Sequence, residues 1–334
     1  MLRLPSFQYH QATSVAEAAA LLAESSPERP VRLVAGGTDL FPNLKRRHQQ
    51  AAAVVSLAQI PELSGITAGE DGVRIGAMTS LTAVASDPLI REQYPALAQA
   101  VASISAPVLR NMGTLGGNLC LDTRCTYYNQ NEEWRQAIHY CMKAAGEVCW
   151  VAPGSPRCWA ISASDAAPIL CALEARVTLV SKDGERVIPV TDLYRDDGIH
   201  YLTKRPDEIL TEVLVPAASA REHCRSSFGK LRRRGSIDFA VLSAAAAVWL
   251  DDAGAVAKAH VFLGAVASSP TPAVATAAAL VGKTLTTEAI TEAAALAKRD
   301  ATPMDNTDFQ PAWRGAMVSK YVAAALRECA GLAG

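Results

Sequence analysis

The middle of the chain carries an unusual concentration of cysteine, which constrains the fold and the chemistry more than any other feature. Five of the eight cysteines lie within 39 residues, from Cys120 to Cys158. The N-terminal residues lack the apolar core of a secretory signal, so we expect a cytoplasmic protein. In a large cytosolic chain, clustered thiols indicate metal binding or redox chemistry before disulfides.

The composition excludes several classes of partner. Half of the residues are apolar and 19% are charged, as in globular proteins, and 334 residues are enough for two or three domains. The formal net charge of −1 gives no electrostatic basis for binding nucleic acid. The longest predominantly apolar run, Phe239–Leu250, has 12 residues including Ser243, whereas a membrane span needs roughly 20. We therefore expect neither nucleic acid nor membrane as a partner.

A glycine pair follows the β-branched run at 31–35, where a strand ends and a helix can begin. Thr38 is the candidate N-cap of that helix, and Asp39 falls in its first turn. Turns of this kind present free backbone N–H groups, and glycine lets a phosphate approach them closely. The alternative is an ordinary tight turn, since the spacing G-x-G-x-x-G is absent.

A second glycine pair lies in the turn Thr114–Asn118, after a helical stretch that ends near Pro107. Two such turns suit a ligand with two phosphates better than one turn does.

The rest of the pattern is that of alternating strands and helices. Strands are predicted at 54–58, 72–77 and 208–216, a hairpin at 177–190 turning at Asp183-Gly184, a strand pair turning at Asp252–Gly254, and helices at 14–24, 286–300 and 312–329. Residues 119–158 show no period, and a loop of this length inside a domain is normally functional. A domain boundary is expected near 217–226, where the periodicity is lost.

The spacing of the last four cysteines in the cluster does not decide which group they bind. Gaps of 15, 7 and 8 residues separate Cys125, Cys141, Cys149 and Cys158. The chain has no C-x-x-C pair of the kind usual in structural zinc sites and bacterial ferredoxins. An iron–sulfur cluster, a zinc site and unligated thiols all remain open. The flanking aromatics Tyr127, Tyr128, Trp150 and Trp159 either shield a cluster from water or simply pack the loop.

Five motifs occur in an order that is specific to one family. They are AGGTDL (35–40), TLGGN (114–118), SDAAPIL (164–170), KLRRRGSIDFAVLSAA (230–245) and LGAVASSPTP (263–272). Together they resemble the FAD-binding subunit of the xanthine dehydrogenase and carbon monoxide dehydrogenase class of molybdenum hydroxylases, over nearly the whole length. The Cys-rich insert between TLGGN and SDAAPIL looks like the β subunit of the 4-hydroxybenzoyl-CoA reductase family.

This resemblance implies an α+β fold. We expect a two-part FAD-binding domain of the molybdenum hydroxylase flavoprotein type with a Cys-rich cluster-binding insert, followed by a C-terminal α+β domain. The expected ranges are 1–218 for the FAD-binding domain (first α/β subdomain 1–60, second subdomain 61–218, insert 119–159) and 224–334 for the C-terminal flavoprotein domain.

The resemblance also implies roles for particular residues. The FAD pyrophosphate would be held by Ala35, Gly36, Gly37, Thr38, Asp39 and Leu40, and by Thr114, Gly116, Gly117 and Asn118. Asp165 would contact the adenosine side of FAD, Lys230 would lie near the isoalloxazine, and Leu210 would make an apolar contact to the flavin. For Lys230 the alternative is a solvated basic strand edge. A 4Fe-4S cluster would be ligated by Cys125, Cys141, Cys149 and Cys158, whereas Cys120 would be a structural thiol.

The function implied is electron transfer within a larger enzyme, with no catalytic residue on this chain. The partners would be a molybdopterin-containing large subunit, a 2Fe-2S small subunit and ferredoxin as electron donor, in a heterotrimer or a dimer of heterotrimers. The reaction would be reductive dehydroxylation of 4-hydroxybenzoyl-CoA to benzoyl-CoA on the large subunit. Two alternatives remain open: the same role in an aldehyde or purine oxidoreductase, and a zinc-stapled adaptor whose Cys loop only docks partners.

Overall fold

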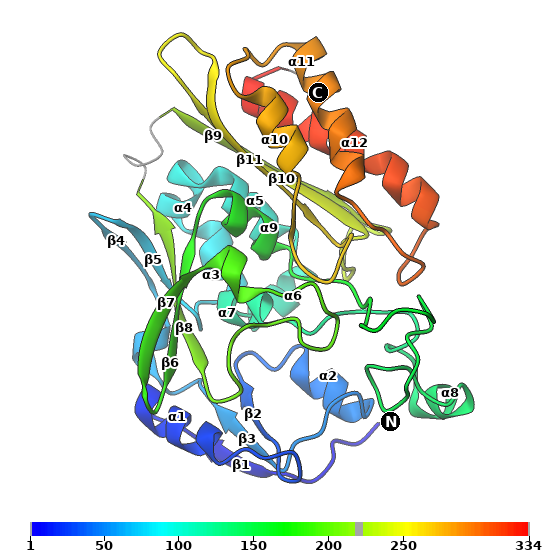
Figure 1. The fold of residues 1–334 in the computed structure, drawn as a ribbon. Coiled ribbons are helices and arrows are strands. Elements are labelled where there is room, and N and C mark those ends of the chain that lie inside the picture. Colours follow the sequence, from blue (N-terminus) through cyan, green and yellow to red (C-terminus); the bar gives the residue numbers. More distant parts are fainter. Residues whose placement is uncertain (1, 218–222, 333–334) are drawn as a thin grey trace.

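The computed structural model of the protein describes residues 2–217 and 223–332, which form three sheets with their helices (Figure 1). The first sheet is parallel, in the order β1-β3-β2, and comprises β1 (Gln8–Gln11), β2 (Val31–Val34) and β3 (Ala53–Ser56). Its helices are α1 (Val15–Ala23) and α2 (Leu40–Lys45), and a 3-10 turn, η1 (Pro61–Leu63), follows β3. The Ser14 side chain caps α1 by accepting a hydrogen bond from the Glu17 amide.

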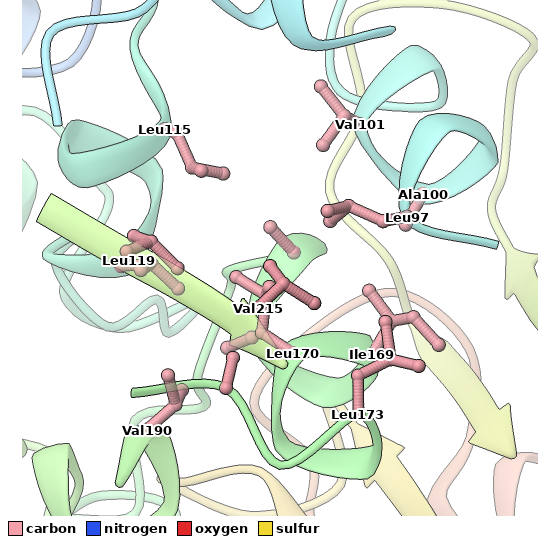
Figure 2. Close-up of a cluster of buried hydrophobic side chains, with 14 of the residues drawn as sticks. Leu97, Ala100, Val101, Leu115, Leu119, Ile169, Leu170, Leu173, Val190 and Val215 are labelled. Carbon is pink, nitrogen blue, oxygen red and sulfur yellow. The ribbon is translucent and has the colours of Figure 1, made fainter. Parts of the chain in front are cut away.

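The second sheet is antiparallel, in the order β4-β5-β8-β6-β7. Its strands are β4 (Ile66–Gly69), β5 (Gly72–Gly76), β6 (Arg176–Ser181), β7 (Gly184–Pro189) and β8 (Ile209–Pro216). The helices beside it are α3 (Leu81–Ser86), α4 (Pro88–Gln93), α5 (Pro95–Ala102), α6 (Pro107–Arg110), α7 (Leu115–Leu119) and α9 (Ala166–Ala172), with the 3-10 turn η2 (Val190–Leu193). Figure 2 shows apolar side chains of α5, α7, α9 and β8 converging in the main core.

The third sheet is antiparallel, in the order β12-β11-β10-β9. It comprises β9 (Cys224–Leu231), β10 (Leu242–Leu250), β11 (Val256–Gly264) and β12 (Thr271–Pro272). Helices α10 (Val274–Leu280), α11 (Thr287–Leu296) and α12 (Pro311–Ala330) cover one face, and η4 (Ala297–Arg299) follows α11. Helices α5 and α9 contact the sheet as well, so this domain packs directly on the second sheet's helices.

The Cys-rich segment connects α7 to α9 with little regular structure. Within it the structure has one helix among the described residues, α8 (Glu132–Ala137). The segment lies beside α2, as Figure 1 shows, and the Arg135 side chain donates to the Arg46 carbonyl at 2.9 Å. Its two ends meet in an antiparallel bridge between Arg124 and Ile161. The insert is therefore a closed loop fixed against the first subdomain.

Most predicted elements are confirmed, with three local differences. The helical stretch predicted to end near Pro107 is instead two helices, since α5 ends at Ala102 and α6 begins at Pro107. Asp39, not Thr38, is the N-cap of α2, and its side chain makes no capping hydrogen bond. The hairpin turns at Lys182-Asp183, because Gly184 already pairs with Ser181. The predicted boundary at 217–226 includes residues 218–222, which lie outside the described part of the chain.

Four strands are not predicted from the sequence, namely β1, β4, β9 and β12. Among the residues that the structure describes, no helix combines the length and the apolar character that crossing a membrane requires.

Candidate cofactor site

The first glycine turn leads from the carboxyl end of β2 into α2. Gly37 has φ +69°, a left-handed conformation that favours glycine. In the part of the chain that the structure describes, no acceptor receives a hydrogen bond from the amides of Gly36, Gly37, Thr38 or Asp39. Unpaired amides at a strand-to-helix turn are the groups that bind a phosphate. The turn therefore fits the predicted pyrophosphate contact.

The second glycine turn lies directly against the first. A Cβ added to Gly36 would lie 1.7 Å from the Met112 carbonyl oxygen, and one added to Gly117 would lie 3.9 Å from the Cβ of Ala35. Only glycine at position 36 permits this approach. The structure thus brings together the two turns that the sequence predicts to form one cradle.

The second turn offers different groups to a ligand. Its amides are already used, since Gly116 donates to the Ala77 carbonyl at 2.9 Å and Gly117 to the Thr114 hydroxyl at 3.1 Å. The turn therefore contributes close backbone approach and the Thr114 and Asn118 side chains rather than free amides. Asn118 Oδ1 accepts from the Ser164 hydroxyl at 2.8 Å and from the Ala166 amide at 3.2 Å, which ties the turn to the start of α9.

Asp165 and Lys230 form a buried ion pair. Lys230 Nζ lies 2.8 Å from Asp165 Oδ2, and each side chain is 3% exposed. The Lys230 ammonium also donates to the carbonyls of Ser103 and Asp238, both at 3.1 Å. Burial raises the pKa of Asp165 to about 6, although Lys230 acts in the opposite direction. The second carboxylate oxygen, Oδ1, has no partner among the described residues.

This pair corrects two expectations. Lys230 is not part of a solvated strand edge, because it is enclosed between β9, α5 and α9. The expected roles also placed Asp165 at the adenosine end of FAD and Lys230 at the isoalloxazine. Side chains 2.8 Å apart occupy one place, so these two roles do not both hold as assigned.

Two further predicted positions lie in the hydrophobic interior. Leu210, on β8, is 6% exposed within the main core, opposite Leu179. Leu40 begins α2 and packs against the small core of Val34 and Leu44.

Arg124 connects the glycine turn to the Cys-rich segment, a role that no motif of the sequence predicts. Its guanidinium forms an ion pair with the Asp39 carboxylate, while Asn43 donates to the same carboxylate at 2.8 Å. Arg124 also lies over the ring of Phe239, 4.7 Å from its centroid. Burial lowers the pKa of Arg124 to about 10. Because Cys125 is the next residue, the first predicted cluster ligand is tethered to the predicted FAD turn.

The four predicted ligands line one cavity. Cys125, Cys141, Cys149 and Cys158 are each 5–7% exposed and share this cavity with Tyr127, Tyr128 and Trp150. Trp159 is placed differently, because its ring stacks with the Arg157 guanidinium at 3.7 Å. Cys120 packs against the main core, in agreement with a structural thiol.

Two opposing effects act on the thiols, and burial is the larger of them. Burial raises the pKa of Cys125 to about 11 and that of Cys158 to about 12. Backbone N–H groups act in the opposite direction, those of Tyr127 and Tyr128 on Cys125 and that of Ala160, 3.4 Å from the sulfur, on Cys158. Amide hydrogen bonds to sulfur are among the groups that set the potential of an iron–sulfur cluster. Within residues 2–217 and 223–332, no three His, Cys, Asp or Glu side chains are grouped as ligands of a single ion.

Two family models cover most of the chain. Residues 5–218 match the FAD binding domain in molybdopterin dehydrogenase, and residues 226–329 match the CO dehydrogenase flavoprotein C-terminal domain. The chain belongs to the FAD-binding flavoprotein subunits of the molybdenum hydroxylase family. The predicted family, the α+β fold and the FAD assignment are thereby confirmed.

Individual relatives agree with this family. The chain is 28% identical to the carbon monoxide dehydrogenase medium chain of Hydrogenophaga pseudoflava over 330 residues, which covers 98% of this chain and 99% of the relative. It is 30% identical over 284 residues to the aldehyde oxidoreductase FAD-binding subunit PaoB of Escherichia coli (80% and 83% covered). It is 29% identical over 263 residues to the putative xanthine dehydrogenase FAD-binding subunit XdhB of Escherichia coli (78% and 75% covered).

The solved structures give the same result. The carbon monoxide dehydrogenase of Hydrogenophaga pseudoflava superimposes with a TM-score of 0.80 at 28% identity, covering 98% of both chains. The branch of the family and the group bound by the cysteines remain predictions.

Proposed function

We propose that this flavoprotein subunit holds one FAD on its two glycine turns and one 4Fe-4S cluster on Cys125, Cys141, Cys149 and Cys158. It would relay electrons between that cluster, FAD and the 2Fe-2S small subunit. The observation that carries the proposal is the convergence of four buried thiols on one cavity, within a segment anchored to the FAD turn. When bound, these cofactors exchange the electrons, while the chain supplies their spacing, burial and electrostatic surroundings.

The chain's own residues have three tasks. The amides of Gly36–Asp39 bind the pyrophosphate, and Gly36 keeps the second turn in contact with the first. The Arg124–Asp39 ion pair fixes the cluster segment at that turn. Tyr127, Tyr128 and Trp150 restrict the access of water to the thiols, which bears on the potential of a cluster.

We further propose that the assembly is a heterotrimer, or a dimer of heterotrimers, in the cytoplasm, with a molybdopterin-containing large subunit. Ferredoxin would deliver electrons to the cluster. The large subunit would reduce 4-hydroxybenzoyl-CoA to benzoyl-CoA, a reaction that consumes a pair of electrons and a pair of protons and releases the hydroxyl as water. The Cys-rich insert supports this branch, since its cysteines resemble the ligands of that family.

Metal and flavin analysis of the purified chain tests the cofactor assignment. We expect about four irons and about four acid-labile sulfides per chain together with FAD. Cys141→Ser should lose the iron and retain FAD, because the glycine turns lie outside the insert. The matched control Cys120→Ser, in the same segment but outside the cavity, should retain both. Stoichiometric zinc without flavin would instead support the adaptor.

A second candidate is the same role in an aldehyde or purine oxidoreductase, which the names of the relatives PaoB and XdhB favour. The complete complex should therefore be assayed in parallel with 4-hydroxybenzoyl-CoA and a low-potential reductant, and with aldehydes or xanthine and an oxidant. Aldehyde or xanthine oxidation without any reduction of 4-hydroxybenzoyl-CoA would overturn the first assignment and leave the flavoprotein role intact.

A further inference from the structure

A buried lysine forms part of the wall of the cysteine cavity. Lys143 lines it together with the four thiols, and its side chain is only 7% exposed. Its ammonium donates to Asp122 Oδ1 at 2.8 Å, to the Thr123 hydroxyl at 2.8 Å and to the Gly198 carbonyl at 2.7 Å. The rings of Tyr128 and Tyr201 face the same ammonium, with centroids at 5.0 and 5.3 Å. Lys143 is thus held at one position as a cation.

The counter-charge of Lys143, the Asp122 carboxylate, is also held in one position. The Asp122 side chain is 7% exposed, and its second oxygen lies within reach of the Gln49 amide at 3.1 Å and the Tyr128 hydroxyl at 3.4 Å. Asp122 therefore keeps the Gln49 amide as a donor even when Lys143 is replaced. This arrangement allows each charge of the pair to be removed separately.

The charge of Lys143 reaches the thiols. Lys143 and Cys158 line the same cavity. The backbone at Gly198 lies between the lysine and a thiol. The Gly198 carbonyl accepts a hydrogen bond from Lys143, and a Cβ added to Gly198 would lie 2.7 Å from the Cys158 sulfur. A fixed cation in the wall of a buried site acts on any charge placed on the thiolates that share the site.

We propose that Lys143 and Asp122 form a charge pair that sets the reduction potential of the group held by the four cysteines. This inference rests on the proposed cluster. Reduction adds one negative charge to such a group, so Lys143 stabilises the reduced form and raises the potential. Asp122 offsets part of that effect. Both are tuning residues rather than ligands, and the purely structural alternative is that Lys143 only ties residues 122–123 to Gly198.

The test is a redox titration of the cluster, followed by electron paramagnetic resonance, in the complete complex. Lys143→Met should shift the midpoint to more negative potential than that of the wild type. Asp122→Asn should shift it to more positive potential, because the lysine is then uncompensated. The double variant should lie between the two single variants. Lys258→Met, which removes an exposed cation paired with Glu174, is the matched control and should leave the midpoint unchanged.

Midpoint shifts of opposite sign in the two single variants distinguish electrostatic tuning from a purely structural role of Lys143. If Lys143→Met fails to assemble, Asp122→Asn alone still decides, since an unchanged or more negative midpoint in that variant overturns the inference. Midpoints that move in the same direction in both single variants also overturn it and leave the cluster assignment standing. A wild-type chain without iron overturns the cluster assignment and the inference together.

Discussion

At the scale of single residues, Asp165 lies in an unusual environment for a carboxylate. One carboxylate oxygen accepts from Lys230, and the other is buried without a partner among the described residues. A charged carboxylate there is costly, because desolvation disfavours the ionised form. Folding therefore raises the pKa of Asp165, although the Lys230 ammonium acts in the opposite direction.

This gives a prediction on pH. The pKa of Asp165 rises on folding from 3.8 to about 6, so its contribution to stability is present below about pH 4 and is lost as the pH rises through about 6. We expect Asp165→Asn to flatten this part of the pH dependence, measured as the urea midpoint at several values between about pH 4 and pH 7. An unchanged slope would mean that Asp165 is ionised throughout.

The sequence predicts the residues that carry a motif but not the side chains that contact them. Glycine pairs and clustered cysteines can be recognised from residue type, and the structure brings each set together. Arg124 and Lys143 could not be found in this way. Each acts through a contact with a side chain distant in the chain or buried in the loop, and no periodicity encodes such a contact.

At the scale of elements, the contact between the two glycine turns depends on the absence of a side chain at Gly36. We predict that Gly36→Ala abolishes FAD binding, because its Cβ would overlap the Met112 carbonyl and separate the turns. Flavin content after purification, with the unfolding midpoint, measures this. Gly154→Ala, an exposed position with nothing within 4 Å, is the control and should keep its flavin. Full flavin in Gly36→Ala would show that the turns can move apart without loss of the site.

Elements with a strong local pattern were predicted, and those set by tertiary contacts were not. Helix α1 follows from its Ser14 cap and alanine-rich sequence, and β2 and β3 follow from β-branched runs. Strand β9 contains adjacent serines and a lysine, and it is defined by its pairing with β10. The Cys-rich segment has no period because its path is fixed by contacts such as that of Thr126 with Asn306.

At the scale of the whole molecule, strand β10 belongs to two hydrophobic cores at once. Ala244, Ala246 and Val248 point into the core beneath α11 and α12, whereas Ala245 and Ala247 join the main core with α5 and α9. The alternation of side chains along a strand produces this division. Small residues on both faces let helices approach from both sides, which explains the alanine run.

The Lys230–Asp165 pair lies at the same junction, which leads to a prediction on stability. Lys230→Met should destabilise the protein by about 3–5 kcal/mol, because it leaves a buried carboxylate unpaired. The double variant with Asp165→Asn should recover much of this loss, measured by urea unfolding and by limited proteolysis between the domains. Lys258→Met, which breaks an exposed pair, should cost no more than about 1 kcal/mol. Equal losses in the two single lysine variants would contradict a special role for the junction.

The bridge between Arg124 and Ile161 has a consequence for how such a chain can be altered. The backbones of these residues exchange hydrogen bonds of 2.9 and 2.8 Å, so the 36 residues between them leave and re-enter the scaffold at one point. A segment whose ends meet can be exchanged without moving the two ends apart, and its contacts elsewhere then decide whether the exchange is tolerated. The cysteine-bearing loop can therefore be exchanged as one unit, provided that its contacts outside the bridge, such as that of Thr126 with Asn306, are replaced as well.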